Sequence, residues 1–157
     1  MSKIGDLYEQ DFVLWAENQA AALRRAKGAN LPLDWENLAE EIESLGKSDR
    51  RELSSRIRRI LQHLLKLQAS PAREPRAGWQ ATIREARKEI QKLLRDSPSL
   101  RREVRDDIED EIDLAADLAV ADLSQHGESV EAVRARLNQA GFTEQQVLDD
   151  WFPDAPG

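Results

Sequence analysis

The 157-residue chain contains no cysteine, and this absence removes several kinds of chemistry at once. Disulfide bonds, thiolate metal sites and cysteine nucleophiles are all excluded. A long apolar run is also missing, since no segment approaches the roughly 20 apolar residues that a membrane-spanning helix needs. The first residues contain no apolar stretch of signal-peptide length, so we expect a cytoplasmic protein with no membrane partner.

Strand patterns and catalytic signatures are absent as well. No segment alternates between apolar and polar residues with the two-residue period of a β-strand. Glycine-rich phosphate loops, nucleophile elbows and paired-histidine zinc motifs do not occur. We therefore expect an all-α protein that carries no cofactor, and we favour a binding role over an enzymatic one.

Apolar residues recur instead at helical spacing along most of the chain. The pattern predicts a second helix that ends at Gly46 and a third that begins near Ser48. Each stripe needs another helix to cover it, so we expect one domain over residues 1–157: a helical bundle of about five main helices plus one or two short C-terminal helices. Residues 150–157 could form a loose tail. The expected helices span about 6–27, 34–45, 48–69, 79–94, 98–126, 129–140 and a last short segment after Thr143.

The net charge of −7 is distributed unevenly along the chain. Residues 1–46 hold 9 acids and 4 bases, residues 47–105 hold 7 acids and 17 bases, and residues 106–157 hold 14 acids and 2 bases. One interpretation is that the basic middle packs beside its acidic neighbours and their fields partly cancel. The other is a basic face for a polyanion, limited by the acidic end.

The best candidate polar site joins the predicted second and third helices. Consecutive helices joined by a short turn usually pack antiparallel, so we expect Glu41 to meet Arg56, Arg59 or His63. One reading is a salt-bridge network that fixes helix register. The other is a polar pocket with Glu41 and His63 as an acid–base pair or as metal ligands. A catalytic zinc site would need three protein ligands, and the arginines would repel a cation, so we expect no metal.

A second candidate is the basic middle with Trp79. Its basic side chains could follow a phosphate backbone while Trp79 stacks on a base. Alternatively Trp79, which starts an apolar stripe, lies in the core, and the basic residues, which alternate with Glu85 and Glu89, cover an ordinary solvated helix. The basic residues in question are Arg73, Arg76, Arg84, Arg87, Lys88 and Lys92.

The acidic C-terminal third offers two further features. A row of four aspartates at helical spacing is most simply a solvated face, since no calcium-binding loop spacing accompanies it; its members are Asp106, Asp110, Asp113 and Asp117. At the end of the chain, Trp151, Phe152 and Pro153 either pack into the bundle or form an exposed docking peptide.

Several short motifs resemble those of a known family. They are LDWENLAEEIESLG at 33–46, HLLK at 63–66, WQATIR at 79–84, SPSL at 97–100 and VLDDWFP at 147–153. Together they resemble the bacterial family catalogued as domain of unknown function 29, from Leu7 to Pro153. The resemblance implies an α-helical domain. It implies no activity and identifies no site residues.

Our leading hypothesis is a non-enzymatic binding or protein-interaction module with an unknown protein partner. The alternative is nucleic-acid binding through the basic middle, and an enzyme or metal protein built on Glu41 and His63 is the third. The candidate binding residues are Glu40, Glu41, Arg56, Arg59, His63, Lys66, Trp79 and Arg87.

Overall fold

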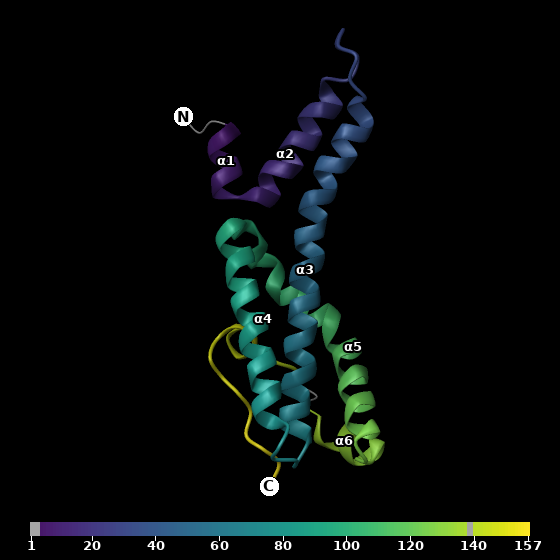
Figure 1. Cartoon of the computed structure of the whole chain (residues 1–157), viewed down its shortest axis with the longest axis vertical. Helices are drawn as coiled ribbons and strands as arrows, with labels where there is room; N and C mark the ends of the chain where they lie inside the picture. Colours follow the sequence, from purple (N-terminus) through teal and green to yellow (C-terminus); the bar gives the residue numbers. More distant parts are fainter. Residues whose placement is uncertain (1–3, 138–139) are drawn as a thin grey trace. The chain divides into compact units, whose positions relative to one another are not determined.

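A computed structural model describes residues 4–137 and 140–157, and this part of the chain is helical without any strand (Figure 1). The all-α prediction is confirmed. No helix among the described residues is long and apolar enough to cross a membrane. The helices are α1 (Ile4–Gln10), α2 (Phe12–Arg25), α3 (Trp35–Ala69), α4 (Arg76–Asp96), the 3₁₀ helix η1 (Pro98–Glu103), α5 (Val104–Gln125), α6 (Val130–Arg136) and α7 (Glu144–Leu148).

The longest helix corrects the sequence prediction. A single 35-residue helix, α3, covers the region where two helices were expected, and Gly46 lies inside it rather than at a helix end (Figure 1). Glycine inside a helix costs about 1 kcal/mol relative to alanine. Here Gly46 is buried, and a Cβ built on it would lie 3.6 Å from Ala16 Cβ. The glycine therefore marks a close approach of α2 to α3.

The first predicted helix, in contrast, is divided in two at Asp11. Its carboxylate caps α2 by accepting a hydrogen bond from Leu14 N at 3.0 Å. The helix ends at Arg25 with Ala26 as its C-cap, slightly before Gly28, whose φ is +100°. The expected helix over 129–140 is the shorter α6; positions 138 and 139 lie outside the described residues.

The chain divides into two compact units. Unit 1 contains residues up to Leu53 together with Lys92–Arg102, and unit 2 contains Ser54–Gln91 and Glu103–Gly157. Helices α3 and α4 each contribute residues to both. The single-domain expectation stays a prediction.

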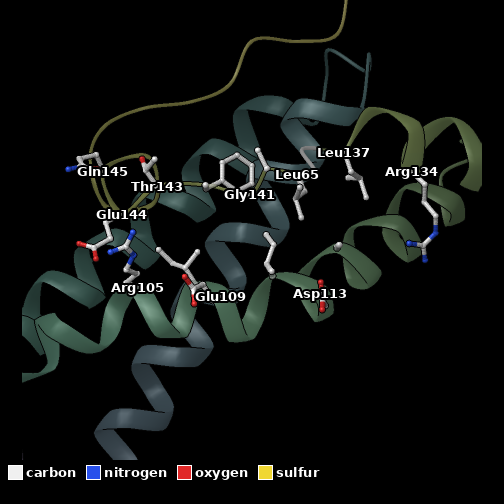
Figure 2. Close-up of a pocket in the computed structure, with 15 residues that line it drawn as sticks. Leu65, Arg105, Glu109, Asp113, Arg134, Leu137, Gly141, Thr143, Glu144 and Gln145 are labelled. Atoms are coloured by element: carbon white, nitrogen blue, oxygen red, sulfur yellow. The ribbon is translucent and has the colours of Figure 1, made fainter.

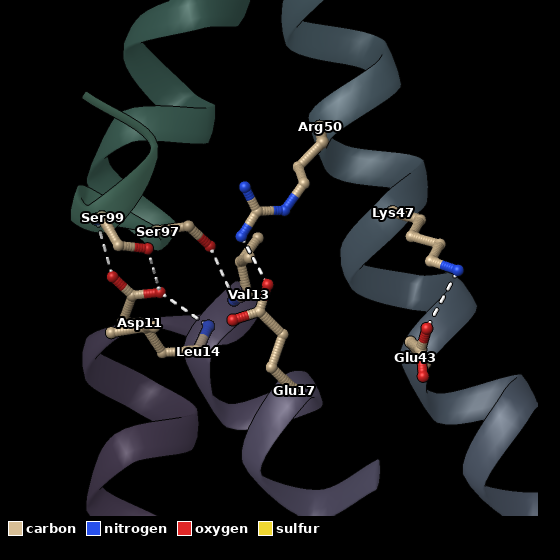
Figure 3. Close-up of polar contacts among 9 residues, drawn as sticks. All are labelled: Asp11, Val13, Leu14, Glu17, Glu43, Lys47, Arg50, Ser97 and Ser99. Atoms are coloured by element: carbon tan, nitrogen blue, oxygen red, sulfur yellow. Dashed lines mark hydrogen bonds and ion pairs between the residues drawn. The ribbon is translucent and has the colours of Figure 1, made fainter. Parts of the chain in front are cut away.

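Unit 1 has a core of mostly small side chains. Its buried apolar residues are Val13, Ala16, Ala20, Ala39, Leu53 and Leu100. Polar contacts complete it at the start of α2, where Ser97 Oγ accepts a hydrogen bond from Val13 N at 3.1 Å (Figure 3). Ser99 N donates to Asp11 Oδ2 at 2.7 Å (Figure 3). The first turn of α2 thus has its free N–H groups satisfied partly by a distant part of the chain.

Unit 2 has a larger core of branched aliphatic side chains. Long stretches of α3, α4 and α5 supply it, and the C-terminal helices add Val133 and Val147. A sub-cluster joins Ala69, Val120, Leu123 and Val133. The fully buried large side chains on the α3 part are Ile57, Ile60, Leu61, Leu64, Leu65 and Leu67.

Candidate functional site

The expected meeting of Glu41 with Arg56, Arg59 or His63 is wrong. Glu41 and His63 both belong to the single helix α3, so they do not face one another across a turn between two helices. Glu40 and Glu41 are exposed residues of unit 1, whereas the three basic residues belong to unit 2. The prediction failed because it depended on a turn at Gly46 that the chain does not make.

Lys66 is the centre of a polar cluster in unit 2. Its ammonium lies 3.2 Å from Asp122 Oδ2 and 5.0 Å from the centre of the Trp79 ring. Gln62 Nε2 donates to the same aspartate oxygen at 2.7 Å. Lys66 is only 7% exposed, so its charge is held by partners that link α3 to α4 and α5. This arrangement stabilises the packing of three helices.

His63 lies beside that cluster. Its Nδ1 is 2.8 Å from the carbonyl oxygen of Arg59, one turn earlier on α3. Burial lowers the pKa of His63, and the charges of Lys66 and Arg59 act in the same direction. The imidazole is therefore neutral at pH 7, with Nδ1 as the donor. Among the described residues, no group of three or more acidic or histidine side chains could hold a metal ion.

Trp79 and two arginines of the basic middle are built into unit 2. Trp79 packs against the sub-cluster around Val133. Arg76 Nη1 donates to the carbonyls of Leu67 and Ser70, at 2.8 and 3.3 Å. The packing of Trp79 agrees with the reading that places it in the core, whereas these hydrogen bonds of Arg76 differ from the solvated helix face that the same reading expected.

Arg87 binds the C-terminal segment most extensively. Its Nε donates to the carbonyl of Val147 at 2.9 Å, and Nη2 donates to the carbonyls of Gln146 and Trp151 at 2.9 and 2.8 Å. The guanidinium also lies 5.1 Å from the centre of the Phe152 ring. Arg87 is 5% exposed, and this burial lowers its pKa. One buried side chain thus fastens the end of α7 and the residues after it to α4.

The aromatic residues near the C-terminus take part in the same packing. Trp151 and Phe142 have ring centres 6.2 Å apart, and Arg84 lies 5.0 Å from the centre of the Phe152 ring. Trp151, Phe152 and Pro153 are all half-buried. The segment is packed against unit 2 rather than held out as a docking peptide.

Unit 2 contains a cavity of about 900 Å³ between α5 and residues 134–137 and 140–145 (Figure 2). We call it the α5 groove. One face of α5 forms its floor with Ile108, Ile112 and Ala116, and Leu65 of α3 also lines the cavity. The opposite wall includes Leu137, Phe142 and the turn at Gly141, whose φ is +80°. The groove is therefore apolar at its base and open at its rim.

Charged side chains border the groove. Arg105, Glu109 and Asp113 follow one another along the groove side of α5 (Figure 2). All three are exposed, and none forms an ion pair within the described part of the chain. Arg134, at the other side, is already paired with Asp117 at 3.3 Å. The rim of the groove thus presents two unpaired carboxylates next to its apolar floor.

The sequence predictions did not identify this groove. Asp113 was assigned to a solvated face, and all four aspartates of that row are indeed exposed. Ile108 and Ile112 belong to the apolar stripe of α5, yet Ile112 is only half-buried. A recognisable signal was the width of the α5 apolar stripe, which includes both Ala115 and Ala116 and so exceeds what one neighbouring helix covers.

Comparison with known proteins supports the fold and assigns no activity. The family described as domain of unknown function DUF29 matches residues 7–152. A solved structure, described as an alpha-helical protein of unknown function from Rhodospirillum rubrum, is 27% identical with a TM-score of 0.71. The match covers 93% of this chain and 91% of that one. No curated protein matches the sequence.

Proposed function

Because the chain belongs to the domain of unknown function DUF29 family, whose description names no activity, we propose its function from the α5 groove. The protein is a non-enzymatic interaction module, and unit 2 docks a segment of a protein partner in this groove. The observation that carries the proposal is an open cavity of about 900 Å³ that has apolar side chains at its floor and charged side chains at its rim.

The size and the lining of the groove support a binding role. Its volume falls in the range of about 300–1,000 Å³ that is typical of ligand sites. An apolar floor with a few polar groups around it supplies both affinity and orientation. The polar groups of the Lys66 cluster, in contrast, already bind one another.

The test compares partners bound by three forms of the immobilised full-length chain. Ile112→Arg places a charge on the groove floor, and Leu114→Arg places the same charge on α5 at a position 47% exposed and outside the groove lining. We expect at least one protein that is retained by the wild type and by Leu114→Arg but lost by Ile112→Arg. Circular dichroism and urea unfolding confirm that both variants are folded.

An identical set of bound proteins for all three forms would contradict the proposal. So would a partner that is lost equally in both variants, because charge on α5 alone would then explain the loss. A mobility shift with nucleic acid at low salt that disappears steeply as salt rises would instead favour the polyanion-binding alternative.

A further inference from the structure

The floor of the α5 groove has the spacing of a helix-binding surface. Ile108, Ile112 and Ala116 follow at intervals of four residues on one face of α5, over roughly 12 Å of helix rise. Side chains at positions i and i+4, or i and i+7, of a docked helix match such a row. Ala116, with its small side chain, leaves room for a larger side chain of the occupant.

Backbone hydrogen bonding also favours a helical occupant. An extended segment needs a strand edge to satisfy its N–H and C=O groups when it is buried. The described residues contain no strand, and the groove wall made by α5 has its own backbone groups bonded internally. A helix satisfies its own backbone and can lay an apolar face on Ile108 and Ile112.

The charges at the rim of the groove indicate which charge the flank of the docked helix carries. Glu109 and Asp113 are four residues apart and lie along the same side of the groove (Figure 2). Glu144 adds a third carboxylate to the lining, and the basic residues there are Arg105 and Arg134, of which Arg134 is paired with Asp117. The surrounding segment, residues 106–157, holds 14 acids and 2 bases, which extends the negative potential beyond the rim.

We infer that the α5 groove takes an amphipathic helix with a basic flank, whose apolar side chains sit on Ile108, Ile112 and Ala116 while lysine or arginine meets Glu109 and Asp113. This inference rests on the proposed function and names the chemistry of the partner. Apolar contact supplies most of the affinity, and the two carboxylates select the partner by charge and speed its association.

The experiment is a selection from a displayed library of helical peptides on the purified full-length chain. The library randomises the flank positions around a fixed apolar stripe. We expect the selected peptides to be enriched in lysine and arginine on one flank. We also expect their affinity to fall about tenfold for Glu109→Gln/Asp113→Asn and to be lost for Ile112→Arg.

The matched control removes the same number of charges from the same helix outside the groove. Asp106→Asn/Asp110→Asn should change the affinity about twofold or less, because neither residue lines the cavity. Peptides that need Ile112 but carry neutral or acidic flanks, or keep their affinity for Glu109→Gln/Asp113→Asn, would overturn this inference and leave the proposed function standing. Failure to select any helical peptide that depends on Ile112 would also overturn this inference, whereas the proposed function is overturned only if Ile112→Arg retains the same partners as the wild type and Leu114→Arg.

Discussion

The helices of the two units pack through different kinds of side chains. Unit 1 brings α2 and α3 together over small side chains such as Ala16 and Gly46, and secures the start of α2 with polar contacts. Unit 2 uses large aliphatic side chains and secures its C-terminal segment with the buried Arg87. Close approach of two helix backbones stabilises unit 1, whereas large side chains that fill the core stabilise unit 2.

The difference also appears on the surface. Large apolar side chains stay exposed in both units, for example Leu31 at 58% and Leu45 at 48% in unit 1 and Leu114 at 47% in unit 2. In unit 2 an apolar floor lies in a recess with charges at its rim. An apolar floor bounded by charged side chains restricts the size and the charge of what can bind, and scattered exposed leucines do not. The chemistry of a partner can therefore be argued only for the α5 groove of unit 2.

The largest effect is expected at Arg87. Arg87→Met fills a similar volume but leaves the carbonyls of Gln146, Val147 and Trp151 without their donors. We expect a loss of about 2–4 kcal/mol in the free energy of unfolding, measured with urea. The matched control, Arg84→Met, loses only its contact with the Phe152 ring and should cost less than about 1 kcal/mol. Equal losses in the two variants would show that Arg87 does not fasten the segment.

A smaller effect of opposite sign is expected at Gly46. Alanine there makes ordinary contacts of 3.6 Å inside a continuous helix, so Gly46→Ala should stabilise the protein by about 0.5–1 kcal/mol. Gly28→Ala is the control in the same unit, because φ of +100° makes alanine strained. It should destabilise the protein by about 1 kcal/mol. If Gly46→Ala destabilised the protein to the same extent, the helix would end at Gly46 after all.

The smallest effect is a pH dependence at Asp107. Burial raises the pKa of Asp107 to about 6, the nearby carboxylates of Glu103, Asp110 and Glu111 add to this, and a hydrogen bond from Ser54 opposes it. Since the folded pKa exceeds the unfolded value of about 3.9, Asp107 contributes stability at low pH that is lost as the pH rises through about 6.

Asp107→Asn should therefore stabilise the protein at pH 7.5 by up to about 1 kcal/mol, a value reduced because the carboxyl is partly solvated. The same substitution should have little effect at pH 4. Urea unfolding at the two pH values measures the difference, and Asp106→Asn serves as an exposed control on the same helix. A gain that is the same at both pH values would contradict the raised pKa.

Local patterns were enough to predict the fold class, and contacts between distant residues explain what they missed. Periodicity located nearly all the helices, and the Thr143–Gln146 capping box was visible in the sequence and is formed. The signal at Gly46 was misleading because glycine ends helices and also permits close helix packing. Only the position of Ala16 distinguishes these two roles.

The candidate site was harder to predict for the same reason. Arg87 and Val147 are 60 positions apart, so no local rule indicates that one donates a hydrogen bond to the other. The α5 groove depends on where residues 134–137 and 140–145 lie relative to α5, which periodicity does not determine. The apolar stripe of α5 predicted that its residues are buried. In the structure some of them lie in the core of unit 2 and others form the floor of the α5 groove.

The most direct test of the central claim is a methyl NMR titration of the full-length chain with a selected basic amphipathic peptide. The account predicts that the methyl signals of Ile108 and Ile112, on the floor of the α5 groove, shift on binding. The signals of Leu38 and Leu45, exposed on α3 in unit 1, should stay unchanged. Shifts at Leu38 and Leu45 without shifts at Ile108 and Ile112 would contradict the account.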